Sequence, residues 1–341
     1  MELPTYKSLE EKKKLFEYHE TINSIKDINE KFFRGPSFNE FQKEPRGDST
    51  FRAYRGNHEA KYMLYTSAQR EWITNEWWLQ GLTFETFIDR LLSNLREHDL
   101  LNRYIRFMGN IPNDLFRLAL LQHYRSMSPL LDATIAKSTA YFFTLKDVTI
   151  TARNENDIEN YFSLYYIYAS KDDIAPFHES FNVICDEQPK DTWNAKKKLD
   201  KLTQWKKDDR LWGKPIQYIA HPALFGKNVD TDDSKENMNS NKKDWLYWSN
   251  LNMVAQDGCF ILNMNGNTPV EKMLHEAGCL SRTIMCYDIH KSLAGYIRAH
   301  LEHNKITDRK IFPSFEAITN EAYESFRRDP IESPPFSIGL Y

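Results

Sequence analysis

The sequence of 341 residues lacks several features that define specialised protein classes. Its four cysteines have no C-x-x-C spacing and no clustered histidines, which argues against a structural zinc site and a disulfide framework. The formal net charge of −3 argues against a protein that coats nucleic acid electrostatically. No stretch approaches the roughly 18 apolar residues of a membrane span, and no apolar signal core follows the charged N-terminus. We therefore expect a cytoplasmic protein with reduced thiols.

Aromatic residues are abundant where glycine is scarce. There are 21 Phe, 18 Tyr and 8 Trp against 12 Gly, while the hydrophobic fraction of 41% is ordinary for a globular protein. Aromatic side chains fill cores and also stack on planar ligands. Core packing is the ordinary use, and a ring-binding site is the alternative.

The apolar patterns predict both helices and strands. An aromatic and β-branched run predicts a strand over residues 161–169, and a second strand is expected at 254–262. Charged residues with spaced apolar positions predict a solvated amphipathic helix over 8–31. Helical spacing also covers residues 84–120, 291–303 and 314–326. Helices and strands alternate without a regular βαβ rhythm, so we predict an α+β fold.

A single mixed domain accounts for this organisation. We expect a helical lead-in over residues 1–45, the domain over 46–330 and a tail over 331–341. A charged segment over 186–210, expected to be helical, and a polar segment without periodicity over 226–244 are predicted to be insertions into that domain.

Three short polar segments interrupt apolar sequence far apart along the chain. They are Tyr54-Arg55-Gly56, then Gln122-His123-Tyr124 leading into Leu130-Leu131-Asp132-Ala133-Thr134, and finally Gln256-Asp257-Gly258-Cys259-Phe260. Arginine, carboxylate and glutamine side chains cost free energy to desolvate. A core does not need them, so we predict that the three segments line one pocket.

Each polar segment has a chemical and a structural interpretation. The Arg55 guanidinium suits a pyrophosphate, and Gly56 would let a ligand approach closely. Arg55 could instead hold a backbone carbonyl or a carboxylate such as Asp132. Asp132 could orient the site, or it could be the N-cap of the helical segment that follows. His123 suits a ribose hydroxyl or proton transfer, and Tyr124 suits ring stacking; structural packing is the alternative for both.

These segments, in this order, resemble the FRG domain family, which is named for an aromatic-Arg-Gly motif. The motif is Tyr54-Arg55-Gly56 here, followed by Leu64, Ser67 and Arg70; the other matches are QHYRSMSPLLDAT at 122–134, Gln256 with Gly258 and Phe260, and Ile311-Phe312-Pro313. The resemblance spans about residues 50–325. Two positions depart from the family pattern, with Arg125 in place of a glycine and Ala133 in place of an aromatic residue.

The motif order is also similar, more loosely, to the three-part active site of ADP-ribosyltransferases. That resemblance implies a central split β-sheet flanked by helices, and an enzyme that cleaves NAD and transfers ADP-ribose to a macromolecule. RNA or DNA is one candidate acceptor. A toxin or antiphage effector with an antitoxin partner is the implied role, with no metal and no membrane. The implied catalytic residues are Arg55, His123, Asp132 and Gln256, and the implied NAD-binding residues are Arg55, Gly56, Gln122, Tyr124, Thr134 and Gly258.

Gln256 departs from the chemistry that this resemblance implies. Breaking the nicotinamide–ribose bond passes through an oxocarbenium-like state, which a carboxylate normally stabilises. A glutamine carries no charge, so the negative charge would have to come from Asp132, Glu59 or Asp257. The alternatives are a non-catalytic nucleic-acid- or protein-binding module, and a metal-dependent nuclease that uses Asp132 and His123.

Overall fold

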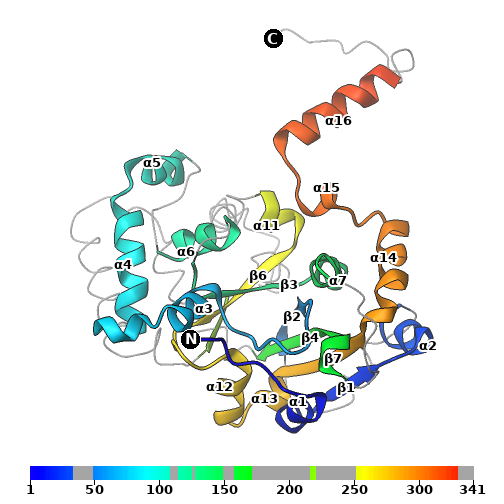
Figure 1. Cartoon of the computed structure of the whole chain (residues 1–341). Helices are drawn as coiled ribbons and strands as arrows, with labels where there is room; N and C mark the ends of the chain where they lie inside the picture. The colour runs from blue at the N-terminus through cyan, green and yellow to red at the C-terminus, as the bar shows by residue number, and fades with distance from the viewer. Residues whose placement is uncertain are drawn as a thin grey trace, which may run out of the picture.

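One seven-stranded sheet forms the centre of the molecule (Figure 1). The computed structural model describes residues 1–33, 49–107, 114–124, 127–148, 157–170, 216–219 and 251–328. The strands are β1 (His19–Ile22), β2 (Ser49–Asn57), β3 (Leu130–Thr134), β4 (Tyr161–Ser170), β5 (Ile216–Ile219), β6 (Gly258–Asn263) and β7 (Ile284–His290). Their order is β1-β7-β4-β2-β3-β6-β5, and every neighbouring pair is antiparallel except β1 with β7. The predicted α+β class, with a central β-sheet flanked by helices, is confirmed.

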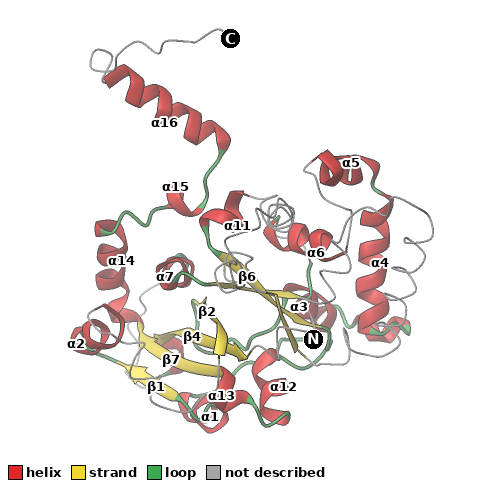
Figure 2. Ribbon diagram, turned by 180° about the vertical axis from the view of Figure 1, so that it is seen from behind, coloured by secondary structure: helices red, strands yellow, loops and turns green. Residues whose placement is uncertain are grey.

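Helices cover both faces of this sheet (Figure 2). They are α1 (Leu9–Leu15), α2 (Ile25–Ile28), α3 (Ser67–Thr74), α4 (Phe84–Glu97), α5 (Asp99–Phe107), α6 (Asp114–His123), α7 (Lys137–Leu145), α11 (Leu251–Ala255), α12 (Val270–Glu276), α13 (Leu280–Thr283), α14 (Ala294–His303), α15 (Asp308–Ile311) and α16 (Phe315–Arg328). None of the helices that the structure describes is both long enough and apolar enough to cross a membrane. The predicted insertions at 186–210 and 226–244 and the tail at 331–341 lie outside the described ranges.

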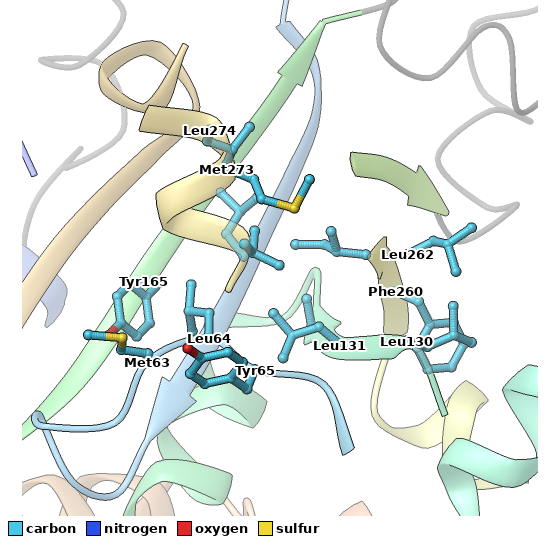
Figure 3. Packing of buried hydrophobic residues seen from close by; sticks show 14 of the residues in the cluster. Met63, Leu64, Tyr65, Leu130, Leu131, Tyr165, Phe260, Leu262, Met273 and Leu274 are labelled. Carbon is cyan, nitrogen blue, oxygen red and sulfur yellow. The ribbon is translucent and has the colours of Figure 1, made fainter. Parts of the chain in front are cut away.

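Strand β4 shows why its sequence is apolar almost throughout. Successive side chains of a strand point to opposite faces. Tyr165 and Ile167 pack into one core cluster with residues of α3, α4 and α12, whereas Leu164 and Tyr166 pack into the other with residues of α7 and α14. Figure 3 shows part of the first cluster, in which Leu64 and Leu131 lie near α12. Both faces of the strand are therefore buried, and the predicted strand at 161–169 is confirmed.

The pairing between neighbouring strands of the sheet is shortest between β2 and β3. Strand β2 pairs with β4 along its length, from Ser49 to Asn57, whereas the pair Tyr54 and Thr134 alone joins β2 to β3. The sheet thus consists of two parts, β1-β7-β4-β2 and β3-β6-β5, that meet at one residue pair. We call this junction the seam.

The N-terminal segment departs from the helix predicted over residues 8–31. It forms α1, then the edge strand β1 paired in parallel with β7, then α2. Phe16, Ile22 and Ile28 are buried, so the segment packs into the domain instead of lying in solvent. The prediction was wrong because tertiary pairing of a short strand overrides a charged local pattern.

A buried polar cluster holds this segment in place. The Lys12 ammonium is fully buried and donates to Ala60 O at 3.0 Å, Ser163 Oγ at 2.6 Å and Asp288 Oδ1 at 2.7 Å. The other Asp288 oxygen lies 2.6 Å from His19 Nε2. We call Lys12, His19, Ser163 and Asp288 the Lys12 cluster, which ties α1 and β1 to β4 and β7.

Other predictions met mixed outcomes. The helical pattern at 84–120 is confirmed as α4, α5 and α6, although residues 108–113 lie outside the described ranges. The strand predicted at 254–262 begins only at Gly258, because residues before it belong to α11. The last two predicted helices are confirmed as α14 and α16.

Candidate functional site

Arg55 lies at the seam and joins the two parts of the sheet. Its Nη1 donates to the backbone carbonyl of Asp132 on β3, at 2.5 Å. This bond adds a side-chain contact where strand pairing is limited to one residue pair. The structural interpretation, in which Arg55 holds a backbone carbonyl, is therefore confirmed. Its Nε is buried and has no hydrogen-bond partner within the described part of the chain, so a donor remains unused.

The electrostatic environment of Arg55 is mixed. Burial lowers the pKa of the guanidinium because it removes water from the charge. The Asp132 carboxylate opposes this shift, and the nearby Arg70 guanidinium adds to it. Arginine stays charged in proteins, so two guanidinium groups lie near the Asp132 carboxylate, and the buried Glu271 carboxyl group also acts on Arg55. Guanidinium groups are well suited to bind an anionic ligand.

Asp132 presents an exposed carboxylate from a strand that is otherwise buried. Its Oδ2 accepts a hydrogen bond from Gln122 Nε2 at 2.7 Å. Gln122 Oε1 in turn lies 3.4 Å from Ser67 Oγ, at the first residue of α3. Gln122 on α6 therefore orients the carboxylate. The interpretation of Asp132 as an N-cap was wrong, because α7 begins at Lys137 and Ala136 precedes it.

Gly56 allows helix α7 to pack closely against strand β2. A Cβ at this position would lie 1.4 Å from Thr144 Oγ1 and 2.8 Å from Ala140 O, both on α7. The prediction that Gly56 admits a ligand was wrong, because α7 fills the space. Gly258 differs, since a Cβ there would make only an ordinary contact of 3.6 Å with Met253 O.

Hydrogen bonds of Thr134 and Gln256 connect strand β3 with helix α15. Thr134 Oγ1 donates to Gln256 O at 2.6 Å, and Gln256 Nε2 donates to Ile311 O at 3.0 Å. The amide of Gln256 is thus engaged with α15, and Phe312 next to it packs edge-on against Phe143 of α7. The structure does not bring the Gln256 side chain to Asp132, so its predicted role on the nicotinamide ribose has no support here.

The remaining predicted residues lie at the end of α6. Tyr124 is 72% exposed, which contradicts core packing and leaves the ring accessible. His123 is the last residue of α6, and its side chain lies outside what the structure describes.

The residues that the structure brings together come from the first two motifs. They are Arg55, Gln122 and Asp132, with Ser67 and Arg70 of α3 beside them. We call these five residues the seam site. Ser67 and Arg70 were noted as part of the FRG-like pattern but were not predicted as site residues. Their three-residue spacing, one helical turn, was the available signal.

A group of three side chains that could hold a metal ion lies away from the seam site in the described ranges. The candidate ligand atoms of His19, Cys286 and Asp288 lie within 4.8 Å of one another, but the Lys12 ammonium already contacts Asp288. No such group among the described residues includes Asp132.

Comparison with known families identifies one domain in this chain. The family model of the FRG domain matches residues 51–153, so the chain carries an FRG domain. The matched span contains all five residues of the seam site, whereas Gln256 and Ile311 lie beyond it. No curated protein and no solved structure matches the chain.

Proposed function

We propose that the FRG domain of this chain is an enzyme of the ADP-ribosyltransferase type. It would cleave NAD, release nicotinamide and transfer ADP-ribose to a macromolecule, with nucleic acid as one class of acceptor and protein as the other. The observation that carries this proposal is the exposed Asp132 carboxylate, held by Gln122 next to a guanidinium with an unused donor.

Asp132 would supply the negative charge that Gln256 lacks. The glycosidic bond to nicotinamide breaks through an oxocarbenium-like state, and an oriented carboxylate stabilises that cation. Glu59, another candidate, forms an ion pair with Lys291 at 2.6 Å and is neutralised there. Asp132 is exposed to an incoming ligand, and its hydrogen-bond donor is an uncharged amide.

Arg55 and Arg70 would bind the pyrophosphate of NAD. Guanidinium groups bind phosphate oxygens through two parallel hydrogen bonds, and both guanidiniums lie near the Asp132 carboxylate. Arg55 would then have two roles, since it also joins β2 to β3. Tyr124 would offer an exposed ring for stacking on a planar group of the ligand.

The role as a toxin or antiphage effector follows from the family resemblance and remains part of the proposal. It predicts that expression of the wild-type chain arrests bacterial growth and that Arg55→Ala relieves the arrest. Growth arrest by both proteins would show that the toxicity does not depend on Arg55. An antitoxin partner and a cytoplasmic location belong to the same proposal.

The direct test compares two carboxylates of the chain. Purified protein is incubated with NAD labelled in the adenylate part, together with total cell RNA, DNA or protein, and released nicotinamide is measured. We expect Asp132→Asn to lower nicotinamide release by about a hundredfold or more. Asp147→Asn is the matched control, because Asp147 is also exposed and lies outside the three motifs.

Two results would contradict the proposal. One is the absence of both nicotinamide release and label transfer with wild-type protein and all three acceptor classes. The other is an Asp132→Asn variant as active as Asp147→Asn. NAD binding without turnover that survives Arg55→Ala would indicate a binding module instead.

A further inference from the structure

Helix α16 extends away from the rest of the described fold (Figure 1). Nothing in the described part of the chain covers its large apolar side chains, since Phe315 is 73% exposed, Ile318 47% and Tyr323 59%. The helix begins in a defined way, because Ala317 N donates to the Ser314 side chain at 3.0 Å. A capped helix with uncovered large apolar groups indicates a surface that another molecule covers.

The large apolar residues of α16 lie on one face, together with Ala322 and Thr319, whereas Ala317 lies on the opposite face. Successive helix residues advance by about 100°, so positions 315, 318, 322, 323 and 326 fall within an arc of less than half a turn. We call these five positions the α16 stripe. Glu324 lies on the opposite face, and Glu316 and Arg327 both lie on the flank next to Tyr323.

We propose that the α16 stripes of two copies of this chain pack against each other in antiparallel orientation. Equivalent flanks of two antiparallel helices face each other across their interface. Glu316, in the first turn, then lies opposite Arg327, in the last turn, of the second copy. The two-fold symmetry makes this ion pair twice, and it places Ala322, a small residue, near the centre.

The charge pattern favours a second copy over a lipid surface. Membrane-surface helices are rich in basic residues on their polar face, because cell membranes carry anionic lipids. Outside its stripe α16 carries three glutamates, Glu316, Glu321 and Glu324, against two arginines, Arg327 and Arg328, so its polar face is not enriched in basic residues.

The predicted dimer is weak. At about 1.5 Å per residue, a 14-residue helix is about 21 Å long, which limits the paired area. Interfaces of this size fall in the transient class, so we expect a dissociation constant on the order of 10 μM. Pairing does not require NAD chemistry, and its failure would leave the proposed function intact.

Charge reversal tests the pairing and its orientation. Sedimentation velocity of the full chain is measured from about 1 to about 300 μM, a range that brackets the expected constant. We expect wild type to dimerise, and Ile318→Asp to weaken dimerisation at least tenfold because it places a charge in the apolar contact. Glu316→Arg and Arg327→Glu should each weaken the dimer by bringing like charges together. The double variant should recover most of the wild-type affinity.

A control separates pairing from helix stability. An acidic first turn and a basic last turn also favour an isolated helix through its dipole, so the single charge reversals could act on the monomer. In that case the double variant would be the weakest of all. Glu324→Arg, on the face opposite the stripe, should leave the dimer unchanged. A wild type that stays monomeric up to the highest concentration, or a double variant without recovery, would overturn the proposal.

Discussion

Two polar clusters lie on the same sheet, and they differ in how completely their groups are satisfied. In the Lys12 cluster, the Lys12 and Asp288 side chains are fully buried, and the ammonium and both carboxylate oxygens have partners. In the seam site, the Asp132 carboxylate is exposed and the Arg55 Nε is buried without a partner in the described ranges.

This difference separates a role in folding from a role in binding. A buried ionic group is tolerated when its hydrogen bonds are complete, and it then fixes the elements that contribute to it. A buried donor without a partner carries a cost that a ligand atom would offset, and a carboxylate in solvent is accessible to such a ligand. The Lys12 cluster is thus a structural tie, and the seam site is the better candidate for chemistry.

The largest expected effect breaks the Lys12 cluster. Lys12→Met leaves the Asp288 carboxylate buried without its main counter-charge, and such a loss costs about 3–5 kcal/mol of unfolding free energy. Urea unfolding at neutral pH measures it. Lys13→Met, at an exposed position on the same helix, should stay within about 0.5 kcal/mol of wild type.

The same pair predicts the direction of the acid response. Burial alone raises the Asp288 pKa, but Lys12 and His19 together bring it below its ordinary value of 3.8. The stabilisation from the charged carboxylate is therefore complete above that value and is lost as the pH falls through the lower pKa of the folded state. The cost of Asp288→Asn should shrink below about pH 4. A cost that stays constant down to pH 2, with the protein still folded, would contradict the role given to Lys12.

A stability effect of intermediate size is expected where α7 packs closely against Gly56 at the seam. Gly56→Ala forces Thr144 away from β2, and overpacking of this kind costs about 3 kcal/mol. Gly258→Ala, in the other glycine motif, should cost less than about 1 kcal/mol because its Cβ makes an ordinary contact. Thermal unfolding of the two variants compares them. Equal costs would mean that Gly56 is not held against α7 as the structure places it.

The sequence predicted best where local pattern and tertiary environment agree. The strand at 161–169 and the helices of residues 84–107 carry strong periodic or β-branched signals that packing reinforces. Strand β1 was not predicted, because the segment His19–Ile22 is short and mostly polar. It is a strand only because it pairs with β7. Lys12 was read as solvated because nothing local reveals a partner that lies 276 residues away.

The candidate site was predicted in part. Arg55, Gln122 and Asp132 lie together as expected, since a polar residue inside an apolar run marks a position with a special role, and their part in a functional site stays a prediction. An apolar run that contains one polar residue does not reveal where that side chain points. Gln256 therefore turned out to hold Ile311, and Gly56 to receive Thr144, because both depend on where a distant helix packs.

The smallest effect on stability is expected at Asp132, and it sharpens the comparison most. The carboxylate is exposed and accepts one hydrogen bond from Gln122, so Asp132→Asn should change the unfolding free energy by less than about 0.5 kcal/mol. The Arg55 contact is to the backbone carbonyl of residue 132, and it survives the substitution. A stable variant that has lost nicotinamide release would assign the carboxylate to chemistry. A loss of several kcal/mol would instead make the seam site a second structural tie, like the Lys12 cluster.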